Sequence, residues 1–189
     1  MKFFIDTAEI DEIKSLSELG LVDGVTTNPS LIYKSGQDFK KVIKEISSII
    51  EGPISAEVTS KDSGEMIAQG KELAKIAKNI VVKVPLTKDG LIACKLLSSN
   101  NIKVNVTLCF SSSQALLAGK LGASYISPFI GRLDDISSVG LNLIKEIVDI
   151  YNLYKNDIKT EVLAASIRSP LQVSQVASMG AHVATIPPK

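Results

Sequence analysis

Short apolar runs alternate with longer amphipathic segments along the chain. Eight runs rich in β-branched residues predict strands, at residues 2–6, 24–28, 53–58, 80–85, 103–109, 125–130, 161–166 and 183–187. Between them, segments such as 39–50, 66–77 and 141–154 repeat apolar residues every three or four positions, which is typical of helices. Strands that start roughly 20 to 35 residues apart, each followed by a helix, favour an all-parallel sheet. Eight such units predict an α/β fold, the (β/α)8 TIM barrel.

A doubly wound open sheet is the alternative fold. It usually carries a glycine-rich phosphate loop after an early strand, and this sequence has none. We therefore predict one (β/α)8-barrel catalytic domain over residues 1–189. The sequence stops after the eighth predicted strand, so the helix that should follow that strand is missing. Three explanations stay open: a truncated chain, a mobile C-terminal segment outside this sequence, or cover by a partner subunit.

The interior of the predicted barrel is polar at one end. Alternate side chains of a barrel strand face inward; with Lys83 inward, Val82 and Val84 face the helices. For the seventh strand the same alternation predicts that Ala164 and Ser166 face inward. The full inward set near the strand C-termini is Asp6, Asn28, Glu57, Lys83, Asn105, Thr107, Ser127, Phe129, Ser166 and Arg168. Branched apolar residues usually fill these layers, and barrel enzymes keep their active sites at this end, so the set predicts a catalytic cavity.

Lys83 lies in the middle of the apolar run Ile80–Pro85. A charge on a strand buried on both faces is costly unless it is paired. The run alone leaves two interpretations: a lysine of an edge strand whose amine extends to water, or a desolvated amine that attacks a carbonyl and forms a Schiff base. The polar residues predicted around it favour the second.

Two carboxylates, Asp6 and Glu57, are available for the proton transfers that carbon–carbon cleavage beside an imine requires. Each also has a structural interpretation. Asp6 is well placed to cap a helix near Ala8, and Glu57 to form a salt bridge with Lys83 and nothing more.

Basic residues follow the sixth and seventh predicted strands, where barrels often bind phosphate. Arg132 and Arg168, together with the Ser166 hydroxyl, suit a phosphate dianion. The alternative is that Arg132 pairs with Asp134 or Asp135 at the surface.

Composition narrows the class of partner. The net charge is +1, only 5% of residues are aromatic, and no block rich in Lys or Arg occurs, which argues against nucleic acid or a membrane surface. No apolar run approaches the ~18 residues of a membrane span, and the N-terminus resembles neither a signal nor a transit peptide. Small molecules are the expected partners.

The chain's few cysteine and histidine residues do not form a motif. Cys94 and Cys109 lie apart, without a CxxC pattern or a histidine cluster, so we predict no metal site, no disulfide framework and a cytoplasmic location. Cys109 is predicted to face inward, but no histidine pairs with it, so it is not expected to act as a nucleophile. The single histidine, His182, is interpreted as structural.

Motifs on the first seven predicted strands resemble the transaldolases, in particular their short single-barrel subfamily. They are FFIDTA (3–8), GVTTNPSL (24–31), SAEV (55–58), VVKVP (81–85), NVTL (105–108), SPFIGRLDD (127–135) and AASIR (164–168). The resemblance spans essentially the whole chain in order. It implies a class I transferase of the non-oxidative pentose phosphate pathway that uses no cofactor.

The resemblance also implies a role for each residue. Lys83 would form the Schiff base with the C2 carbonyl of a ketose phosphate, fructose 6-phosphate or sedoheptulose 7-phosphate. Asp6 would take the C4 hydroxyl proton, while Glu57 and Thr107 with a water would shuttle protons for imine formation and release. The substrate-binding residues would be Thr26, Asn28, Ser30, Asn105, Ser127 and Phe129, with Arg132, Ser166 and Arg168 on the phosphate. Erythrose 4-phosphate or glyceraldehyde 3-phosphate would accept the three-carbon unit.

Two other functions stay open. Fructose-6-phosphate aldolase, which releases free dihydroxyacetone, is similar in fold and lysine, but its members tend to carry glutamine at the position of Glu57 and tyrosine at that of Phe129. A barrel that binds sugar phosphates without catalysis is the second. Because Lys83, Asp6 and Glu57 are all present, we favour an enzyme over a binding protein, and the presence of Glu57 and Phe129 favours transfer over release. Members of the short subfamily form pentamers or decamers, so a homo-oligomer is expected.

Overall fold

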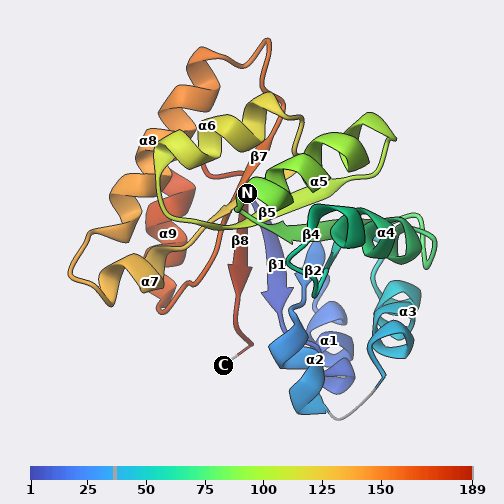
Figure 1. The fold of residues 1–189 in the computed structure, drawn as a ribbon. Coiled ribbons are helices and arrows are strands. Elements are labelled where there is room, and N and C mark those ends of the chain that lie inside the picture. Colours follow the sequence, from blue (N-terminus) through green and yellow to red (C-terminus); the bar gives the residue numbers. More distant parts are fainter. Residues whose placement is uncertain (36–37, 189) are drawn as a thin grey trace.

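A computed structural model describes residues 1–35 and 38–188, and in it eight parallel strands close into a barrel in chain order (Figure 1). The strands are β1 (Lys2–Asp6), β2 (Gly24–Thr26), β3 (Ile54–Glu57), β4 (Ile80–Pro85), β5 (Val104–Cys109), β6 (Tyr125–Pro128), β7 (Glu161–Ala164) and β8 (Val183–Ile186). The helices around them are α1 (Ile10–Ser17), α2 (Pro29–Ser35), α3 (Phe39–Ile49), α4 (Ser63–Ala74), α5 (Lys88–Ser99), α6 (Ser112–Lys120), α7 (Ile130–Asp134), α8 (Gly140–Leu153) and α9 (Pro170–Ser178). The predicted (β/α)8 barrel is confirmed.

Side-chain caps begin several of the helices that follow the strands. The capping residues of α4, α5, α6 and α9 are Asp62, Thr87, Ser111 and Ser169, and each accepts a hydrogen bond from the backbone N–H three residues later. Each cap satisfies a backbone donor that the helix itself leaves free. The caps thereby fix the loops at the C-terminal ends of the strands, where the predicted site lies.

The core has two parts. In the larger part, apolar residues on the outer face of the strands pack against the helices. The helices contribute their own buried residues, such as Val42, Ile43 and Ile46 of α3. A smaller cluster fills the barrel interior and consists of Phe4, Val81, Tyr125, Leu163, Ala165 and Val183. The Phe4 and Tyr125 rings meet edge to face, with centroids 6.0 Å apart. This inner layer fills the N-terminal half of the barrel and confines any cavity to the C-terminal ends of the strands.

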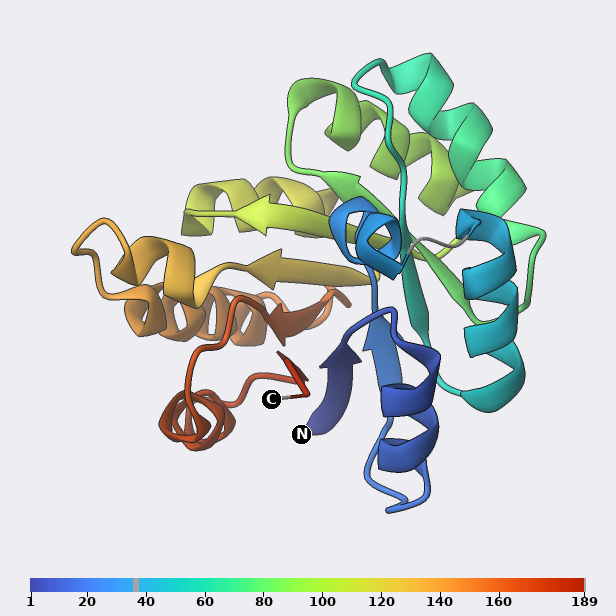
Figure 2. The same ribbon diagram turned by 90° about the horizontal axis from the view of Figure 1, so that it is seen from below.

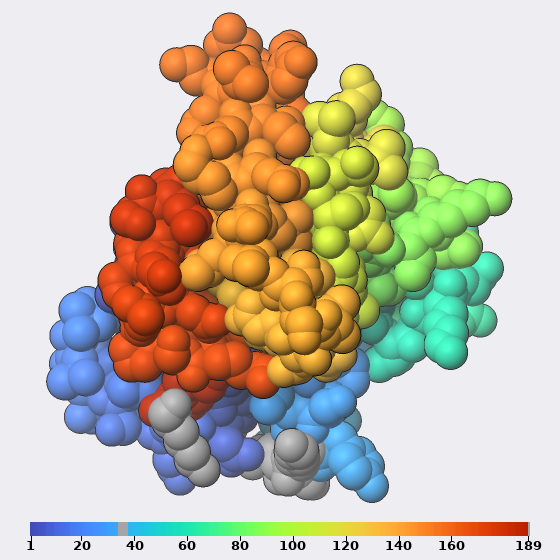
Figure 3. Space-filling model, turned by 90° about the vertical axis from the view of Figure 1, so that its left-hand side faces the viewer, coloured from blue at the N-terminus to red at the C-terminus, as the bar shows by residue number. Residues whose placement is uncertain are grey.

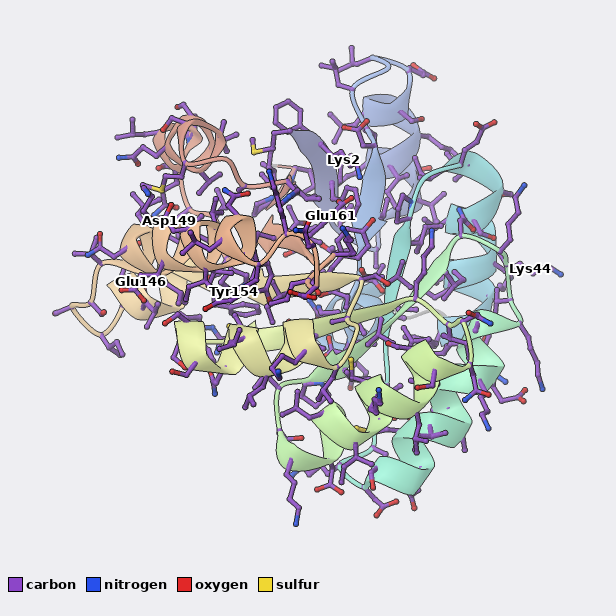
Figure 4. The ribbon with its side chains drawn as sticks, turned by 90° about the horizontal axis from the view of Figure 1, so that it is seen from above. Lys2, Lys44, Glu146, Asp149, Tyr154 and Glu161 are labelled. Atoms are coloured by element: carbon purple, nitrogen blue, oxygen red, sulfur yellow. The ribbon has the colours of Figure 1, made fainter. Side chains whose placement is uncertain are left out.

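The N-terminal end of the barrel carries an ion pair between β1 and β7. The Lys2 Nζ lies 2.9 Å from both carboxylate oxygens of Glu161, and Figure 4 shows the two side chains close together. Strands β1 and β8 pair side by side in the sector between α9 and α1, so the chain enters β1 at one end of the barrel and leaves β8 at the other (Figures 1 and 2). Over residues 1–35 and 38–188, no helix is long and apolar enough to cross a membrane.

Candidate active site

A cavity of about 340 Å³ opens at the C-terminal ends of the strands, the end seen in Figure 2. It is lined by eleven of the thirteen residues that the sequence predicts for the site: Asp6, Thr26, Asn28, Lys83, Asn105, Thr107, Ser127, Phe129, Arg132, Ser166 and Arg168. The volume suits a small ligand. Glu57 and Ser30 do not line the cavity.

Lys83 is buried, with 7% of its surface exposed. Its neighbours Val82 and Val84 lie in the outer core, so the lysine side chain faces the interior. The amine Nζ donates to the backbone carbonyl of Thr27 at 3.2 Å and lies 3.1 Å from Glu57 Oε2. The interpretation as an edge-strand lysine that extends to water is therefore wrong.

Glu57 approaches Lys83 from the side of the barrel wall. Glu57 is the last residue of β3. It lines two hollows beside α4 instead of the central cavity. Its side chain is 16% exposed. Glu57 thus contacts the amine directly and also borders these two hollows outside the central cavity.

Asp6 is held at the end of β1 by a chain of hydroxyl groups. Thr26 Oγ1 donates to Asp6 Oδ1 at 2.8 Å, so the 2.5 Å contact between Thr26 and Thr185 uses the Thr185 hydroxyl as donor. Helix α1 begins only at Ile10, with Glu9 at its N-cap. The helix-capping interpretation of Asp6 is therefore wrong, and within the described residues no hydrogen bond reaches the other carboxylate oxygen, Oδ2.

The amide of Asn105 is oriented by two hydroxyls. Ser127 Oγ donates to Asn105 Oδ1 at 2.7 Å, and Asn105 Nδ2 donates to Ser55 Oγ at 3.1 Å. Nearby, the Thr107 side chain is 1% exposed, and its hydroxyl has no hydrogen-bond partner in the described part of the chain. A buried hydroxyl without a partner is costly. A molecule bound in the cavity would satisfy it.

The two predicted residues near α2 differ in position. Asn28 lines the cavity, and its Oδ1 accepts a hydrogen bond from the Leu31 backbone N–H at 2.9 Å, which fixes the side chain at the start of the helix. Ser30 lies within α2 and is exposed. It does not line the cavity, and its contact with the substrate stays a prediction.

The basic end of the cavity is built on α7 and the segment after β7. The Arg132 guanidinium lies 6.0 Å from the centre of the Phe129 ring, which in turn meets Phe110 edge to face. Arg168, not Arg132, pairs with an aspartate: its Nη1 and Nη2 donate to the two oxygens of Asp135 at 3.2 and 2.8 Å. The alternative in which Asp134 or Asp135 neutralises Arg132 is therefore wrong.

Two strands break the alternation that the sequence predicts. On β7, Leu163 and Ala165 face the interior and Ala164 packs outward, the reverse of the prediction. Ser166 lies beyond the strand with φ of 57°, which turns it and Arg168 back to the cavity. On β5, the register shifts between Val106 and Cys109 around Leu108, whose φ is 61°, so Cys109 packs outward.

The two cysteines cannot act as nucleophiles near neutral pH. Burial raises the pKa of the Cys94 thiol to about 11 and that of Cys109 to about 12. Within the described ranges, no three His, Cys, Asp or Glu side chains cluster in a way that would hold a metal ion.

Some residues of the cavity wall were not predicted. They are Leu163, Ala165, Ile167, Thr185 and Pro187. Thr185 would follow from the alternation on the eighth strand, two residues after the inward-facing Val183. The others depend on how the chain turns after β7 and β8, for which the sequence pattern gives no signal.

Comparison with known proteins places this geometry in a family. A family model described as transaldolase/fructose-6-phosphate aldolase matches residues 3–189. The chain belongs to this family. The family's description names a transaldolase and an aldolase, so the chain is an enzyme of this kind.

Individual relatives agree. Proteins named "probable transaldolase" from Methanococcus maripaludis strain C6 and Parvibaculum lavamentivorans are 60% and 61% identical over 187 and 188 residues. These matches cover 99% and 100% of this chain and 86% of each relative. Among solved structures, a thiamine phosphate pyrophosphorylase from Pyrococcus furiosus superposes with a TM-score of 0.66 over 98% of this chain and 85% of that one. At 15% identity this likeness concerns the fold alone.

Proposed function

We propose that the protein is a transaldolase in which Lys83 forms a Schiff base and transfers a dihydroxyacetone unit between sugar phosphates. The observation that carries the proposal is the buried Lys83 amine, 3.1 Å from the Glu57 carboxylate, among the polar side chains of the cavity. Membership of the transaldolase/fructose-6-phosphate aldolase family supports it. By the same resemblance, the proposal includes a cytoplasmic homo-oligomer, a pentamer or decamer, within the pentose phosphate pathway.

Imine formation is the first step. Glu57 accepts a proton from the lysine ammonium, and the neutral amine attacks C2 of the ketose phosphate. The carbonyl oxygen gains a proton to give the carbinolamine. The carbinolamine then loses this oxygen as water, which gives the imine. Thr107, whose hydroxyl has no partner among the described residues, would hold the water that carries these protons between Glu57 and the substrate.

Cleavage then uses the imine as an electron sink. Asp6 takes the proton of the C4 hydroxyl, the C3–C4 bond breaks, and its electrons move toward the imine to leave an enamine on Lys83. C4 becomes the aldehyde of the departing aldose phosphate. The hydrogen bond from Thr26 fixes Asp6 for this transfer. The enamine attacks the acceptor aldehyde by the reverse route, and water releases the new ketose.

The remaining residues would hold the substrate. Asn28, Asn105 and Ser127, all oriented by hydrogen bonds, would bind the dihydroxyacetone hydroxyls. Thr26 and Phe129 would complete the wall around it. Arg132, Ser166 and Arg168, at the other end of the cavity, would bind the phosphate group.

Release of free dihydroxyacetone is the second candidate function, because the family's own description names both activities. The presence of Glu57 and Phe129 favours transfer. The experiment measures glyceraldehyde 3-phosphate formed from fructose 6-phosphate, with and without erythrose 4-phosphate, in a continuous coupled assay. Sustained formation that requires the acceptor supports transfer. Equal formation without it would identify an aldolase, and no formation in either case would leave a binding protein.

A further inference from the structure

Asp135 forms an ion pair with Arg168 at the rim of the cavity. The two side chains are 52% and 53% exposed, and the carboxylate takes one hydrogen bond from each terminal nitrogen of the guanidinium. Exposed ion pairs contribute little to stability. A guanidinium has five N–H donors, so two are used by Asp135 and three remain. A role in the geometry of Arg168 therefore fits the pair better than a role in stability.

Helix α7 is shaped to receive the Arg168 side chain. A Cβ on Gly131 would lie 2.6 Å from both Arg168 Nε and the Ser166 carbonyl oxygen, closer than atoms approach without displacement. Because Gly131 has no side chain, the arginine crosses the helix at this point and reaches Asp135, four residues later. The glycine and the aspartate thus act on the same side chain at two places.

A second contact ties the same two segments together. Gln172 accepts a hydrogen bond from the Arg168 backbone N–H at 2.8 Å and donates to Asp134 Oδ2 at 2.9 Å. The backbone and the side chain of Arg168 are therefore both fixed relative to the end of α7. Figure 3 shows the α7–α8 and β7–α9 segments, in orange and red, packed side by side on this face.

We propose that Asp135 is a positioning residue that holds the Arg168 guanidinium in the orientation that binds a substrate phosphate. The carboxylate occupies one edge of the guanidinium, and three N–H donors of Arg168, a residue that lines the cavity, remain for a ligand. A long side chain that is ordered before binding loses less entropy when the ligand arrives. The inference rests on the proposed function for the identity of the phosphorylated substrate.

The test compares Asp135→Ala and Asp135→Asn with Asp149→Ala, which removes another exposed, paired aspartate on α8 (labelled in Figure 4). Calorimetry measures the affinity for inorganic phosphate, which needs no turnover. Steady-state kinetics measure KM and kcat with fructose 6-phosphate, and kcat/KM with fructose, which lacks the phosphate.

For Asp135→Ala we expect the phosphate dissociation constant and KM for fructose 6-phosphate to rise about three- to tenfold. We expect kcat to stay within about twofold and kcat/KM for fructose to be unchanged, because the effect reaches the substrate only through its phosphate. Asp135→Asn retains an acceptor oxygen and should restore most of the loss. Asp149→Ala should match the parent protein.

Unchanged or tighter phosphate binding in Asp135→Ala would overturn the inference, as would an equal loss with fructose and fructose 6-phosphate. No phosphate binding by the parent protein would also overturn it. If the parent protein binds phosphate but does not turn over fructose 6-phosphate, the proposed function fails, and the calorimetric comparison still decides the role of Asp135.

Discussion

Lys83 combines burial with two polar contacts, and both bear on its proposed role. The carbonyl of Thr27 and the carboxylate of Glu57 hold the amine in one place at the base of the cavity. An amine that is already ordered and partly desolvated is better prepared to attack a carbonyl than a solvated one. The Glu57 contact also allows a mere salt bridge, so the chemistry has to be tested directly.

Replacing Lys83 by Met keeps the length of the side chain and removes the amine. We expect turnover of fructose 6-phosphate to fall at least about a thousandfold, because no imine can form. The far-ultraviolet circular dichroism should stay that of the parent protein. Lys145→Met, on the exposed side of α8, is the matched control and should retain full activity. Substantial turnover by Lys83→Met would exclude the Schiff-base role.

Arg168→Ala tests the phosphate end of the cavity. Removing hydrogen bonds to a charged group costs about 1.5–3 kcal/mol, so we expect KM for fructose 6-phosphate to rise roughly 10- to 100-fold. Arg168→Lys retains the charge without the fork of donors and should fall between the two. Initial-rate kinetics provide the measurement. An unchanged KM in Arg168→Ala would remove this residue from the phosphate site.

Most of the cavity residues were predictable because they obey one simple rule. Alternation along β1, β4, β5 and β6 identifies which side chains face inward, and a polar residue at such a position stands out. The contact between Arg168 and Asp135 was not predictable. It joins two loops whose relative position is set by tertiary packing, and either aspartate after Arg132 satisfies the sequence pattern equally well.

At the scale of elements, the strand ends decide where prediction fails. Leu108 and Ser166 both adopt positive φ, a conformation that side chains other than glycine seldom adopt. Nothing in a leucine or a serine signals such a turn in advance, so a single alternation through Leu108 on β5, and through Ser166 at the end of β7, was predicted in error. Ser166 lines the cavity and Leu108 follows Thr107, which also lines it. Strained backbone often occurs at functional sites.

His182, the residue before β8, joins β8 to β7 through two hydrogen bonds. Its ring Nδ1 accepts a hydrogen bond from the Val162 backbone N–H at 3.0 Å, and the His182 backbone N–H donates to the Val162 carbonyl oxygen. Partial burial lowers the pKa of His182; Glu161 opposes this shift and Lys2 adds to it. A proton on Nδ1 would remove the acceptor.

The lowered pKa of His182 predicts how stability depends on pH. As the pH falls, His182 of the unfolded chain binds a proton at about pH 6.5, before the folded protein does. The contribution of neutral His182 to the free energy of unfolding is therefore complete above that pH and declines as the pH falls toward the lower pKa of the folded protein. His182→Asn supplies an acceptor that does not titrate. Urea unfolding measures the free energy of unfolding at about pH 7.5 and at about pH 5.5. Between these pH values it should fall less in the variant than in the parent protein. Equal losses would contradict the prediction.

At the scale of the whole molecule, the barrel separates stability from chemistry. An apolar layer around Phe4 and Tyr125 fills the N-terminal half of the barrel interior, and the polar cavity lies at the C-terminal ends of the strands. The closed barrel was predictable because eight alternating units of parallel strand and helix allow few arrangements. The cover of the sector between α9 and α1 was not predictable, because β8 is the last element of the described chain.

The inner layer makes a stability prediction with a built-in control. Phe4 is fully buried, whereas the adjacent Phe3 is 37% exposed. Phe4→Ala should lower the free energy of unfolding by about 3–5 kcal/mol, the usual effect of deleting a core aromatic ring. Phe3→Ala should cost clearly less. Urea titration of the two variants measures the difference, and equal losses would mean that the inner layer does not support the barrel.

Trapping of the imine tests the proposed chemistry most directly. The protein is incubated with fructose 6-phosphate, reduced with borohydride and digested, and the peptides are weighed by mass spectrometry. We predict that one reduced dihydroxyacetone unit is attached to Lys83 and that no such adduct forms on Lys83→Met. An active protein that yields no adduct, or an adduct on another lysine, would contradict the proposal that Lys83 carries the reaction.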